Sequence, residues 1–210
     1  VNAGFTSMQQ LISPTFSFIE KLAERKQLVT GVPSGWDDLD KLTSGWQPGD
    51  LVILAGRPSM GKTSAVMNMA ENAAIQSGKS VAVFSLEMSK EQLVMRMLCS
   101  ASEVSLHKVR TGYLGHEDWP RLTTGAGLLN KASIFIDDTP AQSVLEIRAK
   151  ARRLKHDPQA NLGLIVLDYL QLMRGSGEDS REQEISAISR SLKALAKELN
   201  VPIIALSQLN

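Results

Sequence analysis

The sequence predicts an α/β fold in which a central, mostly parallel sheet is flanked by helices. Five short, almost continuously apolar segments alternate with longer stretches of helical periodicity. Segments that are apolar on both faces are typical of strands covered on both sides, as in a parallel sheet. A glycine-rich segment also lies directly between the first apolar run and the first long helical stretch. The alternation indicates strand–helix–strand units with right-handed crossovers.

The expected elements follow one another in regular order from residue 51. The expected strands are LVILA (51–55), VAVFS (81–85), SIFID (133–137), LIVLD (164–168) and PIIALS (202–207). The expected helices cover 62–77, 89–101, 116–129, 143–156 and 181–199. Gly78 is expected to close the first of them, because glycine readily adopts the left-handed conformation that ends a helix. Before the first strand, residues 30–50 are rich in turn residues, with one helical turn expected at Asp37–Leu42.

The N-terminal residues are predicted to form an arm with one helix (1–29), outside a main domain that spans 30–210. Ser13 and Pro14 are a favourable start for this helix, as N-cap and first helical residue, so the helix is expected over 15–27. Its apolar stripe has no partner within the arm. The stripe consists of Phe16, Ile19, Leu22 and Ala23.

Composition excludes several classes of protein. Of the 210 residues, 43% are hydrophobic and 21% are charged, which is typical of a soluble globular domain. The net charge of +1 indicates no overall attraction to nucleic acid, so any polyanion site is expected to be local or built by several copies. Cys99 is the single cysteine, which excludes an intrachain disulfide and favours a reducing, cytoplasmic setting. No apolar run approaches the ~20 residues that cross a bilayer, so no membrane association is expected.

The segment GRPSMGKT (56–63) predicts a nucleoside triphosphate site of the Walker A type. Its glycines let the backbone curl so that N–H groups point at phosphates, and the following helix adds the partial positive charge of its N-terminus. Lys62 can reach the β- and γ-phosphates, and the Thr63 hydroxyl can bind Mg²⁺. A chance glycine-rich turn is disfavoured because the strand before and the helix after are both expected. The residues expected to contact the nucleotide are Gly56, Arg57, Pro58, Ser59, Met60, Gly61, Lys62, Thr63 and Ser64.

Three polar residues follow expected strands and should therefore lie at the carboxyl edge of the sheet, where ligands of such folds bind. Asp168 could orient Mg²⁺ through water, or it could be a helix cap or turn residue. Glu87 could act as a general base for an attacking water, or it could be a capping or solvated glutamate before the next helix. Gln208 could sense the γ-phosphate through its amide, or it could be an ordinary surface glutamine.

Together and in this order, these elements resemble the hexameric replicative DNA helicases of bacteria and phages, the DnaB family. The resemblance covers nearly everything from Phe16 onward, with Gly56 where some relatives carry alanine. The strings that carry it are TGVPSGWDDLDKLTSGWQPGDLVILAGRPSMGKT, FSLEMSKEQLVMRML, IDDTP, LIVLDYLQLM and EISAISRSLKALAKELNVPIIALSQLN.

The resemblance implies a RecA-type P-loop NTPase fold and gives each candidate residue a role. Lys62 and Thr63 would bind ATP and Mg²⁺, Asp168 would be the metal aspartate, Glu87 the catalytic glutamate and Gln208 the γ-phosphate switch. The helix at 15–27 is similar to the family's linker helix, which docks on a neighbouring subunit.

The implied activity is unwinding of duplex DNA at the replication fork by a hexameric ring that hydrolyses ATP and moves 5′ to 3′ on a single strand. Implied partners are forked or single-stranded DNA, further copies of the chain, primase and a helicase loader, in the bacterial cytosol or nucleoid or in a phage-encoded system. The family's collar domain and its arginine finger are not found in this chain, so the chain alone is expected to hydrolyse ATP slowly. Two alternatives stay open: a RecA/RadA-like recombinase, and a nucleotide-gated assembly module without motor activity.

Two basic regions are candidates for contacting DNA. The glycine-rich loop at 174–184 offers Arg174 and Arg181 to a strand backbone, although its four acidic residues favour an ordinary surface loop equally. The helical stretch at 148–156 is more basic, yet basic residues commonly form the solvated face of a crossover helix, which is the favoured interpretation.

Overall fold

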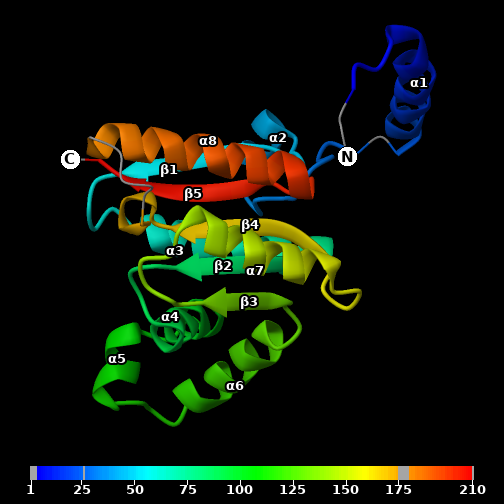
Figure 1. Cartoon of the computed structure of the whole chain (residues 1–210). Helices are drawn as coiled ribbons and strands as arrows, with labels where there is room; N and C mark the ends of the chain where they lie inside the picture. Colours follow the sequence, from blue (N-terminus) through cyan, green and yellow to red (C-terminus); the bar gives the residue numbers. More distant parts are fainter. Residues whose placement is uncertain (1–3, 26, 175–179, 210) are drawn as a thin grey trace.

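The computed structural model describes residues 4–25, 27–174 and 180–209, which form one five-stranded sheet with helices on both faces (Figure 1). All neighbouring strands are parallel, in the order β1-β5-β4-β2-β3. The strands are β1 (Leu51–Gly56), β2 (Ser80–Ser85), β3 (Ile134–Asp137), β4 (Leu162–Asp168) and β5 (Ile203–Gln208). The α/β prediction is confirmed, and each expected strand is found within two residues of its predicted bounds.

Most helices that follow α1 are also where the sequence predicts them. They are α2 (Asp37–Thr43), α3 (Lys62–Ser77), α4 (Lys90–Ser102), α5 (Leu106–Thr111), α6 (Asp118–Leu129), α7 (Val144–His156) and α8 (Arg181–Leu199), with a 3₁₀ turn η1 (Leu170–Leu172) after β4. Within the described residues, α5 and η1 are the two helical segments that had not been expected, because each is too short to show a helical period. Helix α3 ends at Gly78 with φ 60°, as predicted. Helices α4, α7 and α8 each begin after a serine whose hydroxyl accepts a backbone N–H bond, namely Ser89, Ser143 and Ser180.

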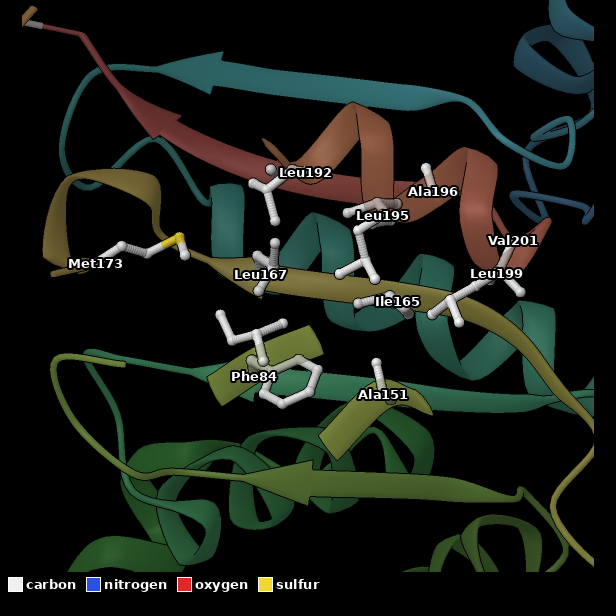
Figure 2. Close-up of a cluster of buried hydrophobic side chains, with 14 of the residues drawn as sticks. Phe84, Ala151, Ile165, Leu167, Met173, Leu192, Leu195, Ala196, Leu199 and Val201 are labelled. Atoms are coloured by element: carbon white, nitrogen blue, oxygen red, sulfur yellow. The ribbon is translucent and has the colours of Figure 1, made fainter. Parts of the chain in front are cut away.

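Alternate residues of the central strands build the core on the two faces of the sheet. In β2, Ala82 and Phe84 face α7 and α8, whereas Val81 and Val83, which alternate with them, face α3 and α4. Figure 2 shows the first of these layers, where Ile165 of β4 lies below Leu195 of α8. Both leucine and isoleucine are 1% exposed or less, and burying such a side chain contributes about 1.5–3 kcal/mol. The sheet is therefore a rigid support for the residues at the carboxyl ends of its strands.

The strand order places four strand ends in one row, at the left-hand edge of the sheet in Figure 1. Residue pairs that lie side by side in this row are Gly56 with Gln208 and Ser85 with Asp168. Strand β5 lies between β1 and β4, so one strand separates the glycine-rich loop from Asp168. The sequence places polar residues at these ends, and the register brings them together.

The N-terminal helix begins earlier than predicted. Helix α1 spans Met8–Arg25, so Pro14 lies inside it, and the expected start at Ser13 is wrong. The physical reason is a reciprocal cap six residues upstream, at Ser7. Ser7 Oγ accepts the Gln10 N–H at 3.3 Å, and Gln10 Oε1 accepts the Ser7 N–H at 3.3 Å. This capping box is visible in the sequence as Ser-x-x-Gln and outweighs the proline.

Helix α1 stands apart from the sheet and its helices (Figure 1). Most of its predicted apolar stripe is exposed, with Phe16 at 62% and Ile19 at 52%, whereas Leu22 is half-buried. The division between an arm at 1–29 and a main domain at 30–210 remains a prediction. Among the described residues, no helix is long and apolar enough to cross a membrane.

Candidate nucleotide-binding site

The glycine-rich loop joins β1 to α3, and its backbone conformation depends on glycine at one point. Gly61 immediately precedes α3 with φ 82°, a left-handed conformation that side-chain-bearing residues rarely adopt. At the other end of the loop, a Cβ on Gly56 would lie 3.3 Å from Cγ and Cδ of Lys62. The lysine side chain therefore crosses close over the first glycine of the loop.

The ammonium of Lys62 lies at the mouth of the loop. Its Nζ donates to the carbonyl oxygens of Gly56 at 2.7 Å and Arg57 at 2.8 Å. A phosphate oxygen is a stronger partner for this cation than a neutral carbonyl, because hydrogen bonds between charged groups are shorter and stronger. The lysine is thus placed where it can exchange carbonyl partners for a phosphate.

A direct hydrogen bond links the loop to the end of β4. Thr63 Oγ1 donates to Asp168 Oδ2 at 2.8 Å, and Asp168 is only 2% exposed. Burial raises the pKa of the Asp168 carboxyl, and so does the negative charge of Glu87, while the Thr63 bond and the positive Lys62 and Arg96 lower it. A hydroxyl and a carboxylate are hard oxygen donors of the kind that Mg²⁺ prefers, so the two residues fit this ion.

The turn after β2 holds Glu87 in place. The Leu86 N–H donates to the Asp168 carbonyl at 2.7 Å. The buried Ser85 hydroxyl donates to the Met88 carbonyl at 2.7 Å and accepts the Met88 N–H at 3.2 Å. Glu87 is fixed between these two anchors, with its side chain exposed.

Glu87 is not the cap of the next helix. Helix α4 begins at Lys90, and the residue that caps it is Ser89, whose Oγ accepts the Gln92 N–H at 3.3 Å. The alternative interpretation of Glu87 as a cap is therefore wrong. Its exposed side chain lines the cleft, and the alternative of an ordinary solvated glutamate stays open.

Gln208 lies directly beside the glycine-rich loop. It is paired with Gly56 in the sheet, and the Leu209 N–H donates to the Gly56 carbonyl at 3.1 Å. The backbone N–H and carbonyl of Gln208 are both bonded to the Gln171 side chain, at 3.2 and 3.0 Å. Its own side chain is half-buried at the cleft.

A cleft of about 450 Å³ brings all four sequence elements together. Its lining residues are Pro58, Ser59, Gly61, Lys62, Thr63, Ser64, Glu87, Met88, Arg96, Asp168, Tyr169 and Gln208. Three expected contacts do not line it. Gly56 and Arg57 supply carbonyls to Lys62 instead, and Met60 is 75% exposed. The roles assigned to the lining residues remain predictions.

The sequence reasoning missed Arg96, Met88 and Tyr169. Arg96 extends from α4 into the cleft, its buried Nε has no hydrogen-bond partner among the described residues, and its charge lowers the pKa of Asp168. A signal for it was present. Arg96 follows the cap Ser89 by seven residues, about two helical turns, so both lie on one face of the helix.

The two arginines proposed for DNA have protein partners in the structure. Arg174 pairs with Glu146 at 3.2 Å, and Arg181 pairs with Glu184 and donates to the Gln171 carbonyl. The loop residues between them, 175–179, lie outside the described residues. Contact of either arginine with DNA therefore stays a prediction.

The basic stretch of α7 forms ion pairs within the chain. Arg148 and Arg152 both pair with Glu198 of α8, and Lys150 pairs with Asp137 at the end of β3. This arrangement fits the favoured interpretation of a solvated crossover helix.

Comparison with known proteins decides the family. Residues 31–210 match the model of the DnaB-like helicase C terminal domain. The chain belongs to the DnaB-like helicase family. It is 51% identical to the replicative DNA helicase DnaB of Geobacillus stearothermophilus, over the whole chain, and 50% identical to the replicative DNA helicase DnaC of Bacillus subtilis (strain 168), over 99% of it. The chain spans 46% of the length of each of these relatives.

Two solved structures share the fold. One, the ATPase domain of another protein, superposes with a TM-score of 0.90 at 35% identity, covering 99% of this chain and 72% of that one. A DnaB-like replicative helicase, studied with its interactions with primase, superposes at 0.86 and 35% identity, covering 99% and 49%. Membership of the DnaB-like family makes this chain a nucleotide-binding domain.

Proposed function

We propose that this chain is the motor domain of a hexameric replicative helicase, which hydrolyses ATP to unwind duplex DNA while moving 5′ to 3′ on a single strand. One observation carries the proposal. The Thr63–Asp168 hydrogen bond joins the glycine-rich loop to the end of β4, inside a cleft that Lys62, Glu87 and Gln208 also line.

The loop and the start of α3 bind the triphosphate. Backbone N–H groups at the helix N-terminus and the Lys62 ammonium neutralise its negative charge. Thr63 and Asp168 would hold Mg²⁺, the threonine directly and the aspartate through water. When bound, the ion would neutralise charge on the β- and γ-phosphates.

Glu87 and Gln208 act on the γ-phosphate. Glu87 accepts a proton from water, whose oxygen bonds to the γ-phosphorus while the bond to the β-phosphate oxygen breaks, giving ADP and inorganic phosphate. Gln208 offers an uncharged amide that can donate to and accept from that phosphate group. The cleft thereby distinguishes ATP from ADP.

The proposed partners are forked and single-stranded DNA, further copies of the chain, primase and a helicase loader. The exposed apolar stripe of α1 supports contact with a neighbouring copy, because exposed apolar patches mark interaction surfaces. The proposed location is the bacterial cytosol and nucleoid, or a phage-infected cell.

Strand separation tests the proposal. The full-length protein is mixed with a forked duplex, Mg²⁺ and ATP, and release of the labelled strand is followed. We expect release with ATP and none with a non-hydrolysable analogue. Homologous strand exchange without fork opening would favour the recombinase alternative. Nucleotide-dependent assembly with neither activity would favour the assembly module.

A further inference from the structure

Gln171, in the 3₁₀ turn after β4, holds the end of β5 through its side-chain amide. Nε2 donates to the Gln208 carbonyl and to Ser207 Oγ, both at 3.0 Å, and Oε1 accepts the Gln208 N–H at 3.2 Å. Because one atom only donates and the other only accepts, this pattern fixes the orientation of the amide. A single side chain therefore satisfies both backbone polar groups of Gln208.

These bonds begin where the regular sheet pairing ends. The register between β4 and β5 stops at Leu167 and Ala205, whereas that between β1 and β5 continues to Gly56 and Gln208. Gln208 thus has a strand neighbour on the β1 side, and the Gln171 side chain bonds its backbone on the β4 side. Gln208 is half-buried, and backbone groups shielded from water are costly to leave without partners, so this amide helps to fix where the strand end lies.

The backbone of Gln171 is tied to another element. The Arg181 guanidinium, at the start of α8, donates to the Gln171 carbonyl. Gln171 does not itself line the nucleotide cleft, while Gln208 does. One residue therefore connects a proposed DNA contact to the proposed γ-phosphate sensor without touching nucleotide.

We propose that Gln171 is a positioning residue, which holds Gln208 in place for contact with the γ-phosphate. Through Gln171, the position of Gln208 also depends on whether Arg181 binds a strand phosphate. The inference rests on the proposed function. When a phosphate of a DNA strand binds the Arg181 guanidinium, the guanidinium no longer donates to the Gln171 carbonyl. The turn that carries the amide then loses one restraint, so strand contact changes how Gln208 is held.

The substitution Gln171→Met, made in the full-length protein, tests whether Gln171 positions Gln208. Methionine keeps the length of the side chain and removes all three bonds. We expect kcat for ATP to fall by about 10- to 100-fold, as misplaced groups do, with KM unchanged because the glycine-rich loop is intact. Backbone amide exchange at Gln208 should also become faster.

Gln142→Met is the matched control. Gln142 is buried, at 1%, whereas Gln171 is half-buried, and the Gln142 amide likewise makes three bonds, to Asp137, Thr139 and Lys150 before and within α7. It should lower stability while kcat and exchange at Gln208 stay at the wild-type values. An active wild type with equal kcat in both variants would overturn the inference and leave the proposed function standing. A wild type without ATP hydrolysis would overturn the proposed function, and unchanged exchange at Gln208 in Gln171→Met would separately overturn the positioning role.

A second variant covers the case in which Gln171→Met does not fold. Gln171→Glu keeps the length of the side chain and the oxygen that accepts the Gln208 N–H. It loses the N–H group that donates to the Gln208 carbonyl. It should also lower kcat at unchanged KM. Wild-type kcat in Gln171→Glu would overturn the inference.

The link to Arg181 is tested by a double-mutant cycle on DNA-stimulated ATP hydrolysis. Arg181→Gln and Gln171→Met should each reduce stimulation by single-stranded DNA, and the double variant should lose no more than the more severe single one. Independent, additive losses would show that the two residues act separately, which contradicts the link.

Discussion

The hydroxyl of Thr63 donates a hydrogen bond to Oδ2 of Asp168 across 2.8 Å, although 105 positions separate the two residues in the sequence. The bond spans from the first turn of α3 to the end of β4, past the intervening strand β5. It holds a carboxylate, 2% exposed, in an environment where burial raises its pKa. The charge that the proposed metal site requires is therefore held where burial disfavours it, so it lowers the stability of the fold.

Asp168→Asn should separate stability from activity. The amide keeps the shape of the side chain and removes a charge from a buried position. We expect the melting temperature to rise by about 2–4 °C, the shift that about 1 kcal/mol produces in a domain of this size, and ATP hydrolysis to be lost. Scanning calorimetry and an ATPase assay measure the two effects.

Asp118→Asn is the opposite case and serves as the control. Asp118 is equally buried, at 2%, but the Gly115 N–H and the Lys108 ammonium stabilise its charge and lower its pKa. Its amide variant should melt at a lower temperature and retain ATP hydrolysis. If both variants shifted the melting temperature in the same direction, the environment described for Asp168 would be incorrect.

The sequence was sufficient to predict the strands and the residues at their ends. Apolar runs identify buried strands, and the carboxyl ends of parallel strands share one edge, so Asp168 and Gln208 could be placed together before the strand order was known. The order β1-β5-β4-β2-β3 itself was not predicted. It depends on which helices pack on which face, and no short segment encodes that.

Side chains that act across elements were the part that could not be predicted. Gln171 lies in a turn too short for periodicity, and its partners at β5 are about 36 positions away. Arg96 is an exception, because the helix was expected to start at residue 89 and helical spacing places Arg96 on the same face as Ser89. The early start of α1 was readable from Ser7 and Gln10, because a capping box outweighs one interior proline.

Glu87→Gln should stop hydrolysis without affecting nucleotide binding. The amide keeps the shape of the side chain but cannot take a proton from water, so turnover should fall on the order of 10²-fold or more. Glu91→Gln is the control, since Glu91 is an exposed carboxylate in the first turn of the adjoining helix. Single-turnover hydrolysis and nucleotide titration measure the two properties. Full turnover in Glu87→Gln would remove Glu87 from the catalytic machinery.

Acid should destabilise the start of α7 through Glu146. The backbone N–H and hydroxyl of Ser143 and the guanidinium of Arg174 lower the pKa of Glu146 from 4.5 to about 2. Between these values the unfolded chain binds a proton that the folded chain does not, so stability falls as the pH drops from 4.5 towards 2. Glu146→Gln should melt at a lower temperature than wild type at pH 7, and the difference should shrink across this window. A difference independent of pH would contradict the capping role.

The two glycines of the loop should respond differently to alanine. At Gly61 the added Cβ meets nothing within 4 Å, but φ 82° is unfavourable for alanine by about 1–2 kcal/mol, so nucleotide affinity should fall by about tenfold as the loop leaves this conformation. At Gly56 the Cβ would meet only Cγ and Cδ of Lys62, at 3.3 Å, and this flexible side chain can yield. Gly56→Ala should therefore change affinity by no more than about twofold. Titration with a fluorescent nucleotide measures both, and a weaker affinity for Gly56→Ala than for Gly61→Ala would show that the lysine side chain, rather than backbone conformation, sets the shape of the loop.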